Sequence, residues 1–323
     1  MPLDPDAESL LAMIRATGRP PLETLTPEEA REAFTAGRKV TAPDPQEVAE
    51  VRDLACPGPA GEIRLRAYRP RGTAADEVLP ALIYFHGGGW LLGDLDSHDT
   101  ACRHYANGAR CRVISVDYRM APEHKFPAAV DDSVAATKWI IGSAAALGIN
   151  HTRVAVGGDS AGGNLSAVLA IMARDGELPP LVYQLLVYPV TDMAMVTRSS
   201  QTVNEGMLTT KTMKWFIDHY LRDPKDVSDW RASPLRAVDL SGVAPALVLT
   251  CTCDPLCDEG IAYAQRLERE GVRVMHLHFS DEPHAFVGQG KVIRAGNTAL
   301  DMMAAALKKV LWPPPPIELP KGK

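Results

Sequence analysis

The sequence lacks the segments that mark a membrane-spanning or secreted protein. No stretch approaches the roughly 20 consecutive apolar residues that a helix needs to cross a bilayer. The first 21 residues have neither the basic start nor the continuous apolar core of a secretory signal. We therefore predict a cytoplasmic protein that has no membrane partner.

Cysteines are few, and basic residues do not exceed acidic ones. Six cysteines in 323 residues, without a secretory signal, favour reduced thiols over disulfides. Cys251, Cys253 and Cys257 lie close together, but no fourth ligand stands at a spacing typical of zinc sites, so we predict no metal. The 34 Lys and Arg residues are outnumbered by 40 dispersed Asp and Glu residues, which argues against a nucleic-acid partner. A small molecule is the expected partner.

After residue 60 the chain alternates short apolar runs with amphipathic segments. The expected strands are 61–70, 81–85, 112–116, 153–157, 182–188, 246–250 and 272–279. The expected helices are 128–147, 161–174, 258–270 and 296–311. This alternation predicts an α/β fold with a mostly parallel central sheet that is flanked by helices on both faces.

Two segments fall outside this alternation. Residues 1–45 carry two short helical patterns, and the second begins at the helix-start signal Thr26-Pro27-Glu28-Glu29. Residues 206–221 form an amphipathic pattern that no strand follows directly. We therefore predict N-terminal cap helices in 1–45 and a main domain of 46–323 with a cap insertion at about 191–235. The proline-rich end, 313–323, is predicted to be extended and exposed.

A candidate nucleophile lies between the predicted strand 153–157 and the predicted helix 161–174. The residues Gly158-Asp159-Ser160-Ala161-Gly162 fit the pattern G-x-S-x-G, a strained turn that lifts a serine oxygen above a sheet. Free backbone N–H groups and the dipole at a helix start favour negative charge there. We predict that Ser160 is the nucleophile and that the N–H of Ala161 stabilises an oxyanion.

A run of three glycines follows the predicted strand 81–85. His86-Gly87-Gly88-Gly89 lets the backbone approach a substrate and direct its N–H groups at one oxygen. A phosphate-binding loop is the rival interpretation, but neither G-K-[ST] nor G-x-G-x-x-G is attached to these glycines. We predict an oxyanion hole formed by Gly87, Gly88 and Ala161.

A serine hydroxyl needs a histidine to remove its proton and a carboxylate to orient that histidine. His284 follows the predicted strand 272–279, and Asp254 follows the predicted strand 246–250. Both positions lie at carboxyl ends of strands, where catalytic groups collect in open α/β sheets. Asp258 and Glu259 are rivals of Asp254, but they stand at a helix start, where acids usually serve the helix dipole. We predict the triad Ser160, His284 and Asp254.

Five stretches of the chain together are similar to the hormone-sensitive-lipase-like family (family IV) of bacterial esterases. They are HGGGW at 86–90, DYRMAPEHKFPAA at 117–129, GDSAGGNL at 158–165, DPLCDE at 254–259 and HAF at 284–286. The resemblance implies an α/β-hydrolase fold, the same triad and a helical cap over the sheet. It also implies a possible homodimer through the last edge strand, 272–279.

These patterns predict a serine carboxylesterase that hydrolyses short- to medium-chain esters through an acyl-enzyme, without a cofactor. Amide or lactone hydrolysis on the same triad is the alternative, because the fold does not choose between acyl groups. A non-catalytic ligand-binding receptor is a further alternative, against which the intact set of residues argues. The predicted substrate pocket comprises Trp90, Asp159, Tyr188, Met207, Leu208 and Trp215. Core packing is the other interpretation for Trp90.

Overall fold

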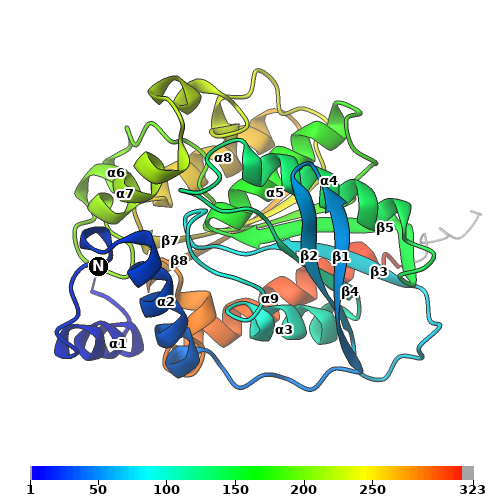
Figure 1. Cartoon of the computed structure of the whole chain (residues 1–323), viewed down its shortest axis with the longest axis horizontal. Helices are drawn as coiled ribbons and strands as arrows, with labels where there is room; N and C mark the ends of the chain where they lie inside the picture. Colours follow the sequence, from blue (N-terminus) through cyan, green and yellow to red (C-terminus); the bar gives the residue numbers. More distant parts are fainter. Residues whose placement is uncertain (1, 315–323) are drawn as a thin grey trace, which may run out of the picture.

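A mixed eight-stranded sheet forms the centre of the molecule, in a computed structural model that describes residues 2–314 (Figure 1). Along the sheet the strands follow the order β1-β2-β4-β3-β5-β6-β7-β8. The strands are β1 (Glu50–Gly58), β2 (Gly61–Arg69), β3 (Leu79–Phe85), β4 (Arg112–Asp117), β5 (Ile149–Asp159), β6 (Tyr183–Val187), β7 (Ala246–Cys253) and β8 (Val274–Pro283). Strand β2 is antiparallel to both of its neighbours, and the strands from β4 to β8 are parallel.

Nine α-helices lie around this sheet in the described residues, and five of them cover its two faces. The nine helices are α1 (Pro5–Ala16), α2 (Pro27–Thr41), α3 (Asp99–Ala109), α4 (Ala128–Gly142), α5 (Ala161–Arg174), α6 (Arg198–Thr202), α7 (Thr210–Tyr220), α8 (Cys257–Arg269) and α9 (Arg294–Leu311). Helices α3 and α9 pack on one face, and α4, α5 and α8 lie on the other (Figure 1). All seven residues of β3 are buried, as a central strand between two helical layers requires.

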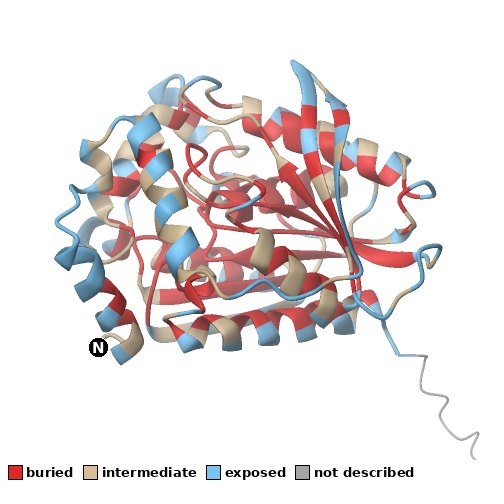
Figure 2. Ribbon diagram, turned by 60° about the horizontal axis from the view of Figure 1, so that its bottom comes forward, coloured by how far each residue is buried: buried red, intermediate tan, exposed pale blue. Residues whose placement is uncertain are grey.

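The predicted fold class is confirmed, and each predicted strand and helix overlaps an observed one. Strand β1 and helix α3 were not predicted, and neither was the five-residue helix α6 (Arg198–Thr202). Strand β1 is exposed along most of its length, so its sequence lacks the apolar alternation of a half-buried strand (Figure 2). Helix α3 has no side-chain N-cap bond, so its start carries no capping signal. The predicted extended end at 313–323 lies, beyond residue 314, outside the described residues.

The two segments outside the alternation meet at one end of the sheet (Figure 1). Helix α2 begins with a capping box in which Thr26 and Glu29 bond each other reciprocally. The 3-10 turn η1 (Leu22–Thr24) joins α1 to α2 and contacts α7. There the Thr212 hydroxyl donates to Glu23 Oε2 at 2.8 Å, which links the N-terminal segment to the segment after β6.

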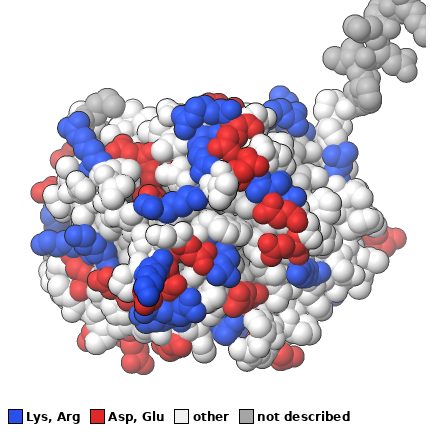
Figure 3. All heavy atoms as spheres, turned by 90° about the horizontal axis from the view of Figure 1, so that it is seen from above, with Lys and Arg blue, Asp and Glu red and all other residues white. Residues whose placement is uncertain are grey.

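The structure also describes the cysteines and the surface charges of residues 2–314. No helix in this range is both long and apolar enough to cross a bilayer. All six cysteines are free thiols, and the described part of the chain holds no group of three or more His, Cys, Asp or Glu side chains placed to bind a metal ion. On the face in Figure 3, basic and acidic side chains are intermixed rather than gathered into a patch of one sign.

Candidate active site

Ser160 stands at the sharp turn between β5 and α5. Its backbone has φ 54° and ψ −115°, a strained conformation that persists because the surroundings fix it. The Ser160 N–H donates to the Val187 carbonyl at 2.8 Å. A side chain at Gly158 or Gly162 would collide with the Phe85 carbonyl of β3. The flanking glycines therefore let the turn lie against the neighbouring strand and raise the serine to the end of the sheet.

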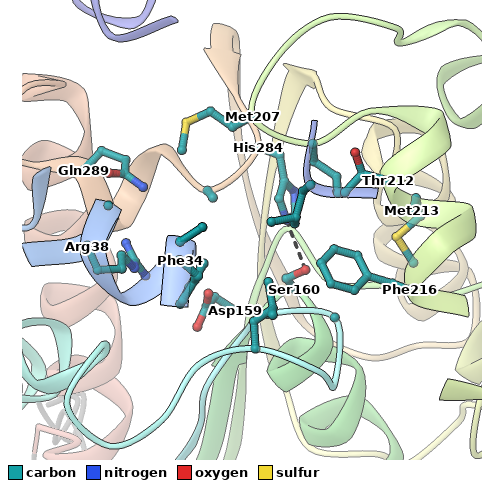
Figure 4. A pocket seen from close by; sticks show the side chains of 18 of the residues that line it. Phe34, Arg38, Asp159, Ser160, Met207, Thr212, Met213, Phe216, His284 and Gln289 are labelled. Carbon is teal, nitrogen blue, oxygen red and sulfur yellow. Dashed lines mark hydrogen bonds between the residues drawn. The ribbon is translucent and has the colours of Figure 1, made fainter. Parts of the chain in front are cut away.

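The structure brings Ser160, His284 and Asp254 together. His284 Nε2 lies 3.0 Å from Ser160 Oγ, and His284 Nδ1 lies 2.7 Å from Asp254 Oδ2 (Figure 4). Because a carboxylate only accepts, Nδ1 carries the proton and Nε2 turns its lone pair toward the serine hydroxyl. The Leu256 N–H donates to the other oxygen of Asp254 at 2.8 Å and fixes the carboxylate. All three side chains are buried, apart from the small part of Ser160 that faces a cavity.

The glycine loop differs from the prediction at its first glycine. The Gly87 N–H donates to Asp159 Oδ1 at 3.0 Å, so this group is already used and does not point at a substrate. Within the described chain no hydrogen bond uses the N–H groups of Gly88, Gly89 or Ala161. Gly88 and Gly89 also line the cavity at Ser160, and both have positive φ. The Gly87 N–H is therefore not free to act as the predicted oxyanion donor, whereas the N–H groups of Gly88, Gly89 and Ala161 have no partner within residues 2–314.

The Asp159 side chain holds the start of the glycine loop 86–89 through a hydrogen bond from Gly87. Its Oδ1 accepts from the Tyr84 hydroxyl at 2.7 Å as well as from Gly87, and His98 Nε2 lies 3.4 Å from Oδ2. Burial by itself would raise the pKa of Asp159, but nearby His98 and Arg38 and the bond from Tyr84 outweigh it and lower this pKa well below its usual value. Asp159 is therefore an anion that holds the glycine loop.

A cavity of about 220 Å³ opens onto Ser160. Of the predicted pocket residues, Asp159, Met207 and Leu208 line it. The complete lining is Leu10, Ile14, Leu22, Ala33, Phe34, Gly37, Arg38, Thr41, Gly88, Gly89, Leu92, Asp159, Ser160, Val190, Met207, Leu208, Thr212, Met213, Phe216, His284, Ala285 and Gln289.

The other three predicted pocket residues lie behind the cavity wall. Trp90 is fully buried and stacks on Tyr220, with ring centroids 4.2 Å apart, so core packing is the correct interpretation. Tyr188 packs behind His284 at 4.5 Å between ring centroids. Trp215 packs on the far side of Phe216, and Phe216 reaches the cavity in its place, because adjacent residues of a helix face different directions.

Sequence reasoning missed the wall that α1 and α2 contribute. Leu10, Phe34 and Arg38 lie more than 100 residues before Ser160 and belong to no motif. The only signal was the amphipathic pattern of the two N-terminal helices, whose apolar stripes need a partner. That pattern predicts packing against the rest of the protein, but it does not say which side chains face the serine.

Known proteins share this architecture. A family model described as alpha/beta hydrolase fold matches residues 82–288. The carboxylic ester hydrolase LipN of Mycobacterium tuberculosis is 45% identical over 88% of this chain and 77% of its own length. The ethyl acetate hydrolase of Pseudomonas putida is 38% identical over 96% of this chain and 100% of its own. The structure of a hyperthermophilic esterase from the archaeon Pyrobaculum calidifontis superposes with a TM-score of 0.89 at 40% identity, covering 96% of this chain and 99% of that chain.

Proposed function

This chain belongs to the α/β-hydrolase family and is a carboxylic ester hydrolase similar to the hormone-sensitive-lipase-like esterases, and we propose that Ser160, His284 and Asp254 carry its reaction. The observation that supports this assignment is the continuous hydrogen-bonded chain of Asp254, His284 and Ser160, at 2.7 and 3.0 Å. Such spacing lets a histidine remove the serine proton while the carboxylate stabilises the resulting imidazolium.

The reaction follows from these positions. Ser160 Oγ attacks the ester carbonyl while its proton passes to His284 Nε2. The carbonyl oxygen becomes an anion, and the free N–H groups of Gly88, Gly89 and Ala161 stabilise it. His284 then protonates the departing alcohol, which leaves an acyl-enzyme on Ser160. Water deprotonated by the same histidine attacks this ester and releases the acid.

The cavity supports a small substrate. Its volume of about 220 Å³ lies below the roughly 300–1,000 Å³ of sites that hold drug-sized ligands. Apolar side chains such as Phe34, Met213 and Phe216 make up much of its wall. We therefore propose esters with short to medium acyl chains as substrates, and residues 1–45 and about 191–235 as the cap that closes over them.

Two further assignments are proposals of the same kind. Within residues 2–314 strand β8 pairs only with β7, so this edge of the sheet is open, and we propose that two copies pair there to form a homodimer. Light scattering on the purified protein would contradict this if it gave the mass of one chain.

The cytoplasmic location expected from the sequence stays a prediction, which cell fractionation would test.

An acyl-length series of p-nitrophenyl esters tests the proposed function. We expect rates that peak at short chains and fall by about 10⁴-fold or more in Ser160→Ala. Ser166→Ala is a matched control, because Ser166 is a buried serine on α5 whose hydroxyl, among residues 2–314, bonds only the Gly162 carbonyl. Full activity in Ser160→Ala would refute the assignment of the nucleophile. A faster rate on a matched amide than on its ester would favour amide hydrolysis instead.

A further inference from the structure

An arginine of the N-terminal segment lines the same cavity as Ser160. Arg38 projects from α2, and Figure 4 shows it with Gln289 on one side of Ser160, while Phe216 and Met213 lie on the other. The cavity therefore has an apolar side formed by α7. It also has a polar side, where α2 and the 3-10 turn η4 (Phe286–Gln289) place Arg38 and Gln289 near the Phe34 ring and the Asp159 carboxylate. No step of ester cleavage by the triad uses the polar side.

The Arg38 guanidinium has little to bind within the protein. Among residues 2–314 no carboxylate oxygen lies within 4.0 Å of it, and its one hydrogen-bond contact joins Nη2 to His98 Nε2 at 3.3 Å. Its Nε is buried and has no acceptor in this range. A guanidinium has five N–H donors in a planar fork that matches a carboxylate. Asp159 is the anion near this cation, but it accepts no hydrogen bond from the guanidinium, so donors of Arg38 stay free for a carboxylate ligand.

The surroundings hold the guanidinium in place rather than leaving it free to turn into solvent. It lies over the Phe34 ring, with Cζ 5.5 Å from the centroid. It also packs against Gly288, where a Cβ atom would occupy the space of the guanidinium. Next to it, Gln289 is buried and also lines the cavity, and its side-chain amide makes no hydrogen bond to residues 2–314. Arg38 and Gln289 together thus present unused donors to one part of the cavity.

We propose that Arg38, assisted by Gln289, binds a carboxylate carried by the substrate, so that this enzyme prefers esters that bear a second, anionic group. The inference rests on the proposed function, because it concerns the same cavity and the same scissile ester. The carboxylate can belong to the acyl part, as in a monoester of a dicarboxylic acid, or to the alcohol part, as in an acylated hydroxy acid. Both place the same anion at the polar side of the cavity.

Two pairs of substrates distinguish these sources. Monoethyl glutarate is compared with the ethyl ester in which an isopropyl group replaces its carboxylate, and acetylated gamma-hydroxybutyrate is compared with its isopropyl analogue. Released acid is titrated at constant pH. We expect kcat/KM of the wild type to be at least about tenfold higher for the anionic member of one pair, mainly through a lower KM. The pair that shows this preference identifies the side of the ester that faces Arg38.

Variants then assign the preference to Arg38. In Arg38→Met the ratio of anionic to neutral kcat/KM should fall about 10- to 100-fold. Lys39→Met removes the same charge from the next residue of α2, which is exposed and outside the cavity, and should leave the ratio unchanged. Gly288→Ala keeps the charge but displaces the guanidinium, so it should also lower the ratio, and it leaves α2 intact if Arg38→Met folds poorly.

The possible results separate the proposed role of Arg38 from the proposed ester hydrolase activity. Wild-type cleavage of both members of each pair at equal rates would overturn the proposal and leave the ester hydrolase intact. Cleavage of no ester at all would overturn the proposed function itself. A fall of both rates by the same factor in Arg38→Met, with an unchanged ratio, would mean that Arg38 only balances the charge of Asp159, and it would overturn the proposal as well.

Discussion

Asp159 offers a sharp test of how the glycine loop is held. Both the Tyr84 hydroxyl and the Gly87 N–H donate to the same oxygen, Oδ1, at 2.7 and 3.0 Å. An asparagine can place its amide oxygen at that position and keep both bonds, whereas alanine removes the acceptor. The two substitutions therefore separate the role of the hydrogen bonds from the role of the charge.

The expected magnitudes follow from burial. Tyr84 and Gly87 are both buried, and a buried donor without an acceptor costs about 1–3 kcal/mol. Asp159→Ala should therefore lower the free energy of unfolding by about 2–6 kcal/mol, out of a typical total of about 5–15 kcal/mol. Because the loop that carries Gly88 and Gly89 would also lose its anchor, kcat should fall by about 100-fold, as when one oxyanion donor is lost. Asp159→Asn should lower the free energy of unfolding by less than about 1.5 kcal/mol and kcat by less than about tenfold.

Urea unfolding followed by fluorescence and kcat on p-nitrophenyl butyrate measure the two effects. The reasoning would be refuted if Asp159→Ala unfolded at the same urea concentration as Asp159→Asn. It would also be refuted if both variants lost kcat equally, because the charge of Asp159, and not its hold on Gly87, would then decide activity.

Three further changes have defined outcomes. Asp254→Asn should lower kcat by about 10⁴-fold, because an amide N–H facing His284 Nδ1 leaves Nε2 protonated; an unchanged kcat would contradict the triad. Phe216→Ala should move the preferred acyl length upward and cost short-chain esters about tenfold in kcat/KM, and an unchanged length profile would place the acyl chain elsewhere. Burial raises the pKa of Glu259 from 4.5 to about 8, so the buried carboxyl favours its protonated form, and the stability present at low pH is lost as the pH rises through this range. The free energy of unfolding should therefore fall by up to about 1.4 kcal/mol per pH unit between about pH 4.5 and pH 8, and it should fall less steeply in Glu259→Gln. Urea unfolding of both proteins across this pH range measures the effect. The same pH dependence in the two proteins would contradict the prediction.

Local sequence was enough to predict the strand-to-helix turn at Ser160. The glycines around it are required by the close approach of β5 to β3, and the pattern G-x-S-x-G contains them within five residues. The positions of Asp254 and His284 were also predictable, although they lie far from Ser160 in sequence. In a parallel sheet the carboxyl ends of neighbouring strands meet at one edge, so loops after β7 and β8 have to converge near the end of β5.

The tertiary structure alone decided which groups of these segments face the substrate. The sequence alone favours Gly87 as an oxyanion donor, but in the fold Asp159, 72 residues away, accepts its N–H. Trp90 and Trp215 are turned into packing contacts, and Arg38 reaches the cavity from α2 although no motif contains it. Motifs record the constraints that backbone geometry imposes on neighbouring residues. The direction of a side chain or a free N–H depends on packing between segments that are distant in sequence, and only the folded chain brings those segments together.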